Sequence, residues 1–210
     1  VNTVNVKRRN EILVATRDVF LAEGLEGLTM RKVASQVGIS APALYRHFDN
    51  KDALLATVVD EGYRVFSRYL FEALQAPTPL ERLAAVGRQY LRFALEQRDY
   101  YRLIFLSWNQ LERERHRGVK HPTQIAPTFQ LLVDRVTECL ASGELEPRAT
   151  AFELAVLLFS QCHGLASLYL TGGLSEAFDE AAFEAMAQKV LDTLLGALAP
   201  ASDEPTPEAS

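Results

Sequence analysis

The chain has 210 residues, of which 48% are hydrophobic, and a formal net charge of -5 at pH 7. This length suffices for a self-supporting core, and the hydrophobic share excludes a wholly disordered protein. Uncharged apolar runs fall short of the roughly 20 residues that a membrane span requires, and no secretion signal is recognisable, so we expect a soluble, cytoplasmic protein with no membrane partner.

The charge is distributed unevenly along the chain. Residues 1–51 carry eight basic and five acidic residues, a net charge of +3, whereas the remainder carries 14 basic and 22 acidic residues, a net charge of -8. Only the N-terminal part is therefore expected to face a polyanion such as DNA.

The first predicted helix covers residues 9–23. Ile12 and Phe20 belong to an apolar set at helical spacing, and Gly24 follows as the helix end. The basic run at residues 7–9 (KRR) has two interpretations, a solvated helix start or a contact with DNA phosphates.

Residues 29–51 (TMRKVASQVGISAPALYRHFDNK) predict two short helices joined by a tight turn. The hydroxyls of Thr29 and Ser40 can cap these helices, and Gly38 supplies a left-handed residue between them. Pro42 falls in the first turn of the second helix, where a missing N–H costs little. This is the pattern of a helix-turn-helix, whose second helix would lie in a DNA major groove.

The rest of the chain predicts further amphipathic helices and no strands. Their expected ranges are 52–75, 79–97, 100–111, 122–142, 147–170 and 176–198. Because the last two are long and strongly apolar, they suggest an additional buried face such as a subunit interface. Residues 199–210 have the composition of a disordered acidic tail. We therefore expect an all-α protein with a DNA-binding domain at 1–51 and an effector-binding and dimerisation domain at 52–198, in which 52–75 is the linking helix.

Neither catalysis nor metal binding is indicated. The histidines His47, His116, His121 and His163 lie in no nucleophile motif, and no glycine-rich phosphate loop occurs. Neither His116 with His121 nor Cys162 with His163 has two-ligand spacing on one helical face. The sequence thus predicts no enzyme, no cofactor and no metal site.

The first 60 or so residues resemble the TetR family of bacterial transcriptional regulators. The resemblance rests on AEGLEGLTMRKVASQVGIS and on ALYRHFDNKDALL, and CHGLASLYL (residues 162–170) is similar to the penultimate helix of one TetR subgroup. It implies an all-α homodimer with an N-terminal three-helix DNA-binding unit. It also implies a C-terminal body that binds a small ligand and dimerises through its last two long helices.

By this resemblance, Thr29, Tyr45 and Lys51 would contact DNA phosphates. The full set of predicted DNA-binding residues is Thr29, Arg31, Ser40, Ala41, Pro42, Ala43, Tyr45, Arg46, His47 and Lys51. Many relatives have a polar or basic residue, then Gly, then Thr or Ser, where this chain has Ala41-Pro42-Ala43. Apolar contacts with thymine methyl groups and DNA shape would then carry more of the readout.

Two arginines keep alternative interpretations. Arg46 could contact guanine or pair with Asp49, and Arg31 could bind phosphate or pair with Glu26.

A set of aromatic residues could line a cavity for a small lipophilic effector or form plain core. The set comprises Tyr90, Phe93, Tyr101, Phe105, Trp108 and Phe129. His163, on an apolar helix, is either a hydrogen-bonded interior histidine or a ligand-sensing or interface residue.

The sequence as a whole predicts a ligand-responsive repressor, a homodimer that a small lipophilic effector releases from a near-palindromic DNA operator. Two alternatives stay open. One is an effector-independent regulator or architectural protein of the same fold, and the other is an all-α enzyme or interaction module that retains the helix-turn-helix.

Overall fold

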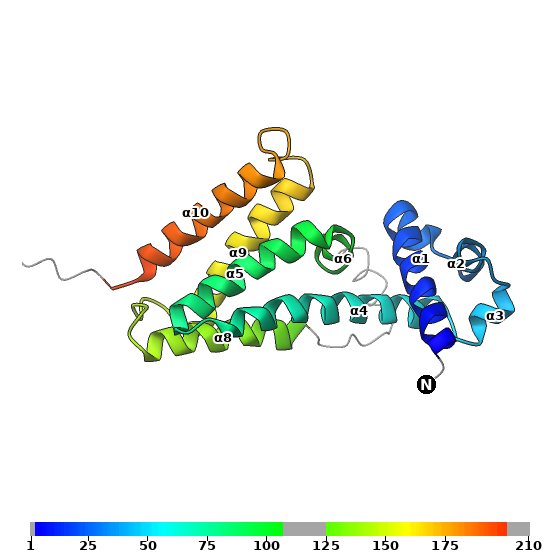
Figure 1. Cartoon of the computed structure of the whole chain (residues 1–210), viewed down its shortest axis with the longest axis horizontal. Coiled ribbons are helices and arrows are strands. Elements are labelled where there is room, and N and C mark those ends of the chain that lie inside the picture. The colour runs from blue at the N-terminus through cyan, green and yellow to red at the C-terminus, as the bar shows by residue number, and fades with distance from the viewer. Residues whose placement is uncertain (1–2, 107–124, 201–210) are drawn as a thin grey trace, which may run out of the picture. The chain divides into compact units, whose positions relative to one another are not determined.

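The structure is a computed structural model that describes residues 3–106 and 125–200. These ranges contain helices and turns and no strand, which confirms the all-α prediction (Figure 1). The elements are α1 (Thr3–Gly27), α2 (Met30–Val37), α3 (Ala41–Tyr45), α4 (Lys51–Glu72), a 3₁₀ turn η1 (Ala73–Gln75), α5 (Pro79–Glu96), α6 (Arg98–Tyr101), a π-type turn η2 (Arg102–Leu106), α8 (Ile125–Ala141), α9 (Ala151–Leu170) and α10 (Glu180–Leu198). The predicted tail lies outside the described residues from position 201 onward.

The chain packs into two compact units. Among the described residues, the first unit comprises 3–69, 92–106 and 125, and the second comprises 70–91 and 126–200. Helices α4 and α5 each contribute to both units. The predicted domain boundary after residue 51 concerns function rather than packing, and it stays a prediction.

In the first unit, α1 packs on α2 and α2 packs on α3. Each helix supplies a fully buried apolar side chain to this packing, Ile12 from α1, Val33 from α2 and Leu44 from α3. Gly24 interrupts α1 with a φ of 69°, and the chain then makes one further helical turn to Gly27. The sequence therefore located the interruption, whereas the extra turn after it depends on packing.

Helix α4 is capped at its N-terminus by the side chain of Asn50. The side-chain oxygen of Asn50 accepts a hydrogen bond from the backbone N–H of Ala53 at 2.8 Å. Leu54 and Val58 are fully buried one turn apart. The predicted helix at 52–75 ends regularly at Glu72 and tightens into the 3₁₀ turn.

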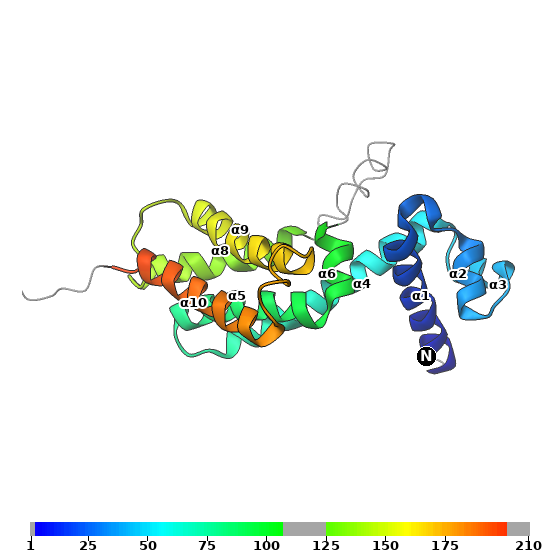
Figure 2. The same ribbon diagram turned by 90° about the horizontal axis from the view of Figure 1, so that it is seen from above.

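The second unit contains the first part of α5 together with α8, α9 and α10. Helix α9 starts at Ala151, later than predicted, because Thr150 and Glu153 form a reciprocal capping box. Asp179 caps α10 by accepting a hydrogen bond from the N–H of Ala182 at 2.8 Å. Helices α9 and α10 lie side by side in Figures 1 and 2 and are in contact.

Helix α9 is unusually apolar for its exposure. Among the described residues it is the one helix whose length and composition would allow a membrane span, with a mean hydropathy of 1.4, although only 33% of that stretch is buried. Buried core helices of globular proteins meet the same criterion. Four large apolar side chains of α9, those of Phe152, Val156, Leu157 and Leu168, are at least 41% exposed.

Candidate nucleic-acid interface and effector cavity

The helix-turn-helix is formed by three local interactions. The Thr29 hydroxyl accepts a hydrogen bond from the N–H of Lys32 at 3.2 Å, and the Ser40 hydroxyl accepts one from the N–H of Ala43 at 3.3 Å. Between them Gly38 ends α2 in the left-handed region, with a φ of 71°. These are the caps and the turn that the sequence predicted.

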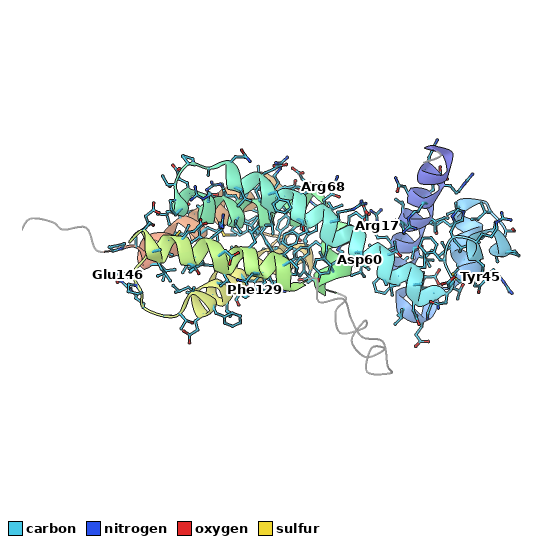
Figure 3. The ribbon with its side chains drawn as sticks, turned by 90° about the horizontal axis from the view of Figure 1, so that it is seen from below. Arg17, Tyr45, Asp60, Arg68, Phe129 and Glu146 are labelled. Atoms are coloured by element: carbon cyan, nitrogen blue, oxygen red, sulfur yellow. The ribbon has the colours of Figure 1, made fainter. Side chains whose placement is uncertain are left out.

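Helix α3, the second helix of the helix-turn-helix and the one predicted to lie in a DNA major groove, has only five residues. It ends at Tyr45, and Arg46 follows as its C-terminal cap with helical backbone angles. Leu44 is fully buried whereas Tyr45 is 53% exposed, and Figure 3 shows Tyr45 on the outer surface of the three-helix unit. Arg46 is also exposed. The short helix thus presents one large aromatic side chain and one guanidinium to solvent.

The other predicted contact residues around α3 differ in exposure. Thr29, Arg31, Ser40 and Pro42 are exposed. The remaining predicted residues of this segment, Ala41, Ala43 and His47, are intermediate. Lys51 is likewise intermediate, so each of the ten predicted residues has some accessible surface.

The local ion pairs that competed with DNA contact are not formed. Among the described residues, Arg46 makes no ion pair with Asp49, and Arg31 makes none with Glu26, within 4.0 Å. Both guanidiniums are therefore available to an external anion. Their contact with phosphate or guanine stays a prediction.

Lys51 has a structural partner that the sequence did not reveal. Its ammonium donates a hydrogen bond to the backbone carbonyl of Leu25 at 3.3 Å, across 26 positions of the chain. This carbonyl belongs to the last turn of α1, where carbonyls lack helical partners. An ammonium has three N–H donors, so this bond leaves capacity for a phosphate.

The basic run at residues 7–9 contacts the helix-turn-helix. The guanidinium of Arg9 lies over the Phe48 ring, 5.0 Å from its centroid, and Arg8 pairs with Glu11 at 2.9 Å and approaches the Val37 carbonyl at 3.4 Å. Sequence reasoning left this run undecided between solvent and phosphate. A cation–π contact of this kind orders the arginine side chain and leaves its positive charge exposed.

The predicted aromatic set divides between the two units. In the first unit, Phe93 and Tyr101 are fully buried and Tyr101 packs against Phe105 with ring centroids 5.2 Å apart. Phe66 joins this cluster, 4.8 Å from Phe93. These residues form close-packed core. Trp108 lies outside the described residues, as do His116 and His121.

The other members of the set gather in the second unit around Phe159. Phe129 on α8 packs edge-on against Phe159, with ring centroids 5.9 Å apart, and against Phe152, with ring centroids 5.5 Å apart. Tyr90 meets Phe159 edge-on at 5.8 Å, and His163 stacks flat on it at 5.5 Å with an interplanar angle of 8°. Phe159, which the sequence did not single out, is therefore the centre of this group.

A small apolar cavity adjoins this group in the second unit. Its volume is about 40 Å³, and its walls come from α5, α8, α9 and α10. The lining residues are Leu83, Ala84, Val86, Gly87, Tyr90, Leu132, Leu158, Phe159, Cys162, Leu191 and Leu195. Of the predicted effector-binding residues within 3–106 and 125–200, only Tyr90 contributes to these walls.

His163 is half-buried and hydrogen-bonded to a residue that lines this cavity. Its Nδ1 lies 3.0 Å from the Tyr90 hydroxyl, although 73 positions separate the two residues. Burial lowers the pKa of the His163 imidazole below its ordinary value, which favours the neutral ring near pH 7. The pair is therefore a neutral hydrogen-bonding group beside an apolar space.

The two cysteines are free and buried. Burial raises the pKa of the Cys139 thiol to about 11 and that of the Cys162 thiol to about 12. Both are therefore protonated and unreactive at neutral pH. Within residues 3–106 and 125–200, no group of three or more His, Cys, Asp or Glu side chains could hold a metal ion.

Models of two known protein domains match the chain. A family model described as the tetracyclin repressor-like C-terminal domain matches residues 83–194, which is more than half of the chain. A second model, described as bacterial regulatory proteins of the tetR family, matches residues 12–58 and so covers the helix-turn-helix. The chain belongs to the TetR family of bacterial transcriptional regulators. Its helix-turn-helix is accordingly the DNA-binding part of a TetR-family regulator.

Two characterised TetR-family relatives are similar in sequence, both from Mycolicibacterium smegmatis. The transcriptional activator FasR is 31% identical over 100 residues, which are 47% of this chain and 46% of FasR. The transcriptional repressor KstR2 is 27% identical over 153 residues, which are 67% of this chain and 68% of KstR2. The match thus spans about half the length of FasR and two thirds of KstR2.

Solved protein structures share the fold over nearly the whole chain. A Rhodococcus sp. RHA1 protein superimposes with a TM-score of 0.72 at 25% identity, covering 92% of this chain and 96% of its own. The ketosteroid transcriptional regulator KstR2 of Mycobacterium tuberculosis superimposes with a TM-score of 0.72 at 18% identity, covering 96% and 97% of the two chains. At that identity the second likeness concerns the fold alone.

Proposed function

We propose that this TetR-family protein is a homodimeric repressor that a small lipophilic effector releases from a near-palindromic operator. The observation that carries the DNA-binding part is the capped helix-turn-helix, whose α3 presents Tyr45 and Arg46 to solvent beside an anchored basic run. Two such helices, one from each subunit, would enter successive major grooves about 34 to 36 Å apart or a multiple of this distance. Repression is supported by the similarity to the repressor KstR2 over 67% of the chain.

The subunit interface of this proposal lies on α9. Phe152, Val156, Leu157 and Leu168 are between 41% and 59% exposed. At 3.6 residues per turn they fall within about one half of the circumference of α9, where they form a broad apolar stripe. Such a surface on a 20-residue helix is typical of a site that contacts a partner. A second copy of the chain provides the same stripe and can cover it by two-fold symmetry.

The proposed dimer can be tested by introducing a charged side chain into the apolar stripe of α9. We expect Val156→Glu to shift the protein from dimer to monomer in sedimentation velocity, because a buried unpaired carboxylate is costly. Thr137→Glu, at an exposed position of α8, is the matched control and should stay dimeric. Unchanged dimerisation of Val156→Glu would place the interface elsewhere.

The DNA-binding function is tested by selecting bound sequences from a genomic library with the purified full chain. We expect a near-palindrome, and a gel-shift titration should then show that Tyr45→Phe weakens its binding several-fold while leaving sequence preference unchanged, as for a phosphate contact. Tyr69→Phe removes a phenol outside the helix-turn-helix, where Tyr69 donates to Glu96 at 2.7 Å, and serves as the control. Failure to enrich any sequence would refute the DNA-binding proposal and favour an interaction module.

An effector-independent regulator is the second candidate. It is favoured by the cavity volume of about 40 Å³, because pockets for drug-sized ligands commonly have about 300 to 1,000 Å³. The two candidates separate in one assay, operator binding across a panel of lipophilic metabolites. Release by any of them supports the first candidate, and unchanged binding throughout supports the second.

A further inference from the structure

The described walls of the cavity in the second unit are almost entirely apolar. Among the residues that the structure describes, its lining includes no Lys, Arg, Asp, Glu or His, and only Tyr90 and Cys162 bring a polar side-chain atom. A charged group placed there would lose its hydration without gaining a counter-ion, which is strongly unfavourable. The walls therefore select against carboxylates, phosphates and ammonium groups.

The space is also narrow. A volume of about 40 Å³ corresponds to about three water-sized spheres, so a bound molecule must have a small cross-section or force the helices apart. Gly87 keeps the space open on the α5 side, since a Cβ there would lie 3.2 Å from Leu191 Cδ1 and 3.6 Å from Cys162 Sγ. A single aliphatic chain meets this limit with the least rearrangement, whereas a fused ring system does not.

The Tyr90 hydroxyl, which is hydrogen-bonded to His163, is a polar group at the cavity wall. The Tyr90 hydroxyl is 3.0 Å from His163 Nδ1, and Phe159 packs against both rings, which holds the pair in place. Phenol and imidazole are each able to donate and to accept a hydrogen bond. The pair is thus suited to a neutral head group such as a hydroxyl or a carbonyl.

We propose that this cavity binds one neutral, unbranched aliphatic chain whose hydroxyl or carbonyl head hydrogen-bonds at the Tyr90–His163 pair. This inference rests on the proposed function in one respect: the aliphatic ligand is taken to be the effector whose binding lowers the affinity of the protein for its operator. Binding would expand the space between α5 and α10, displacing Leu191 from Gly87. The length of the aliphatic ligand would determine its affinity for the cavity, because each buried methylene group contributes about 0.8 kcal/mol.

The test uses the full chain with 1-octanol, octanoate, octylamine and progesterone as probes at pH 7. We expect 1-octanol to bind in isothermal titration calorimetry and to raise the melting temperature, because a ligand of the folded state stabilises it. Octanoate and octylamine should bind at least tenfold more weakly, and progesterone should not compete. Tighter binding of a charged probe would overturn the neutral head group, and tighter binding of progesterone would overturn the single chain.

Two variants locate the site. Tyr90→Phe retains the ring and should weaken 1-octanol binding about fivefold, the usual effect of one lost hydrogen bond. Gly87→Ala should abolish binding by filling the space, whereas Gly196→Ala, where an added Cβ meets nothing within 4 Å, is the matched control and should bind normally. Equal 1-octanol binding by Gly87→Ala and the parent chain, or no binding of 1-octanol at all, overturns the proposal. Operator selection without any probe reports separately on the DNA-binding function.

Discussion

The ammonium of Lys51 donates to the Leu25 carbonyl at 3.3 Å and so joins the first turn of α4 to the last turn of α1. Both segments belong to the first compact unit. Lys51, which is predicted to bind phosphate, therefore also connects two helices of the DNA-binding unit through a hydrogen bond. A substitution at this position changes two properties that have to be measured separately.

We predict that Lys51→Ala lowers the free energy of unfolding by about 1 kcal/mol through the lost hydrogen bond. The same substitution should weaken operator binding and reduce the slope of log affinity against log salt by about 1, as expected for one lost phosphate contact. Urea unfolding and gel shifts at several salt concentrations measure the two effects. An unchanged salt slope would leave Lys51 with the structural role alone.

Two glycines provide a matched pair for the turn. Gly38, with a φ of 71°, and Gly143, with a φ of 76°, both adopt left-handed backbone, and an added Cβ meets nothing within 4 Å at either position. The cost of alanine is therefore backbone strain of about 1 to 2 kcal/mol at each. We predict similar losses of melting temperature for Gly38→Ala and Gly143→Ala, and weaker operator binding only for Gly38→Ala. Equal effects on DNA would show that general stability, and not the turn, governs binding.

Arg17 on α1 links the three-helix unit to α6. Its guanidinium contacts Asp18 at 2.8 Å and Asp99 at 3.5 Å, and it lies 5.2 Å from the centroid of the Tyr100 ring. We predict that Arg17→Met costs more stability than Asp99→Asn, since it removes the cation–π contact as well as the ion pair, each about 0.5 to 1 kcal/mol. A double-mutant cycle measured by urea unfolding should give a small positive coupling energy. Strict additivity would mean that Arg17 and Asp99 do not interact in solution.

The Cys162 thiol predicts a loss of stability in alkali. Burial raises its pKa to about 12, whereas an unfolded cysteine has a pKa of about 8.5. Above about pH 8.5 the unfolded chain releases this proton first, so the stabilisation is complete below that pH and declines towards the folded pKa by up to about 1.4 kcal/mol per pH unit. Urea unfolding between pH 8 and 10.5 should show this decline, and Cys162→Ala should show a shallower one. Parallel curves for the two proteins would assign the decline to other groups.

The sequence by itself determined the helix-turn-helix because its signals are local. Thr29 and Ser40 bond to N–H groups three residues away, and the left-handed turn needs only Gly38. These interactions depend on residue type and spacing within one turn of helix. The same holds for the resemblance to the TetR family, which lay almost entirely in this segment.

Only the tertiary structure decided which distant side chains meet. Helical spacing places an aromatic residue on an inner face and does not say which helix covers it, so Phe93 and Tyr90, three positions apart, fall into different units. The Tyr90–His163 bond joins residues 73 positions apart, and the Lys51–Leu25 bond joins residues 26 apart. Long-range contacts of this kind arise from the packing of whole helices, which no local pattern encodes. The neutral, narrow character of the cavity follows from that packing, and with it the class of effector that we propose.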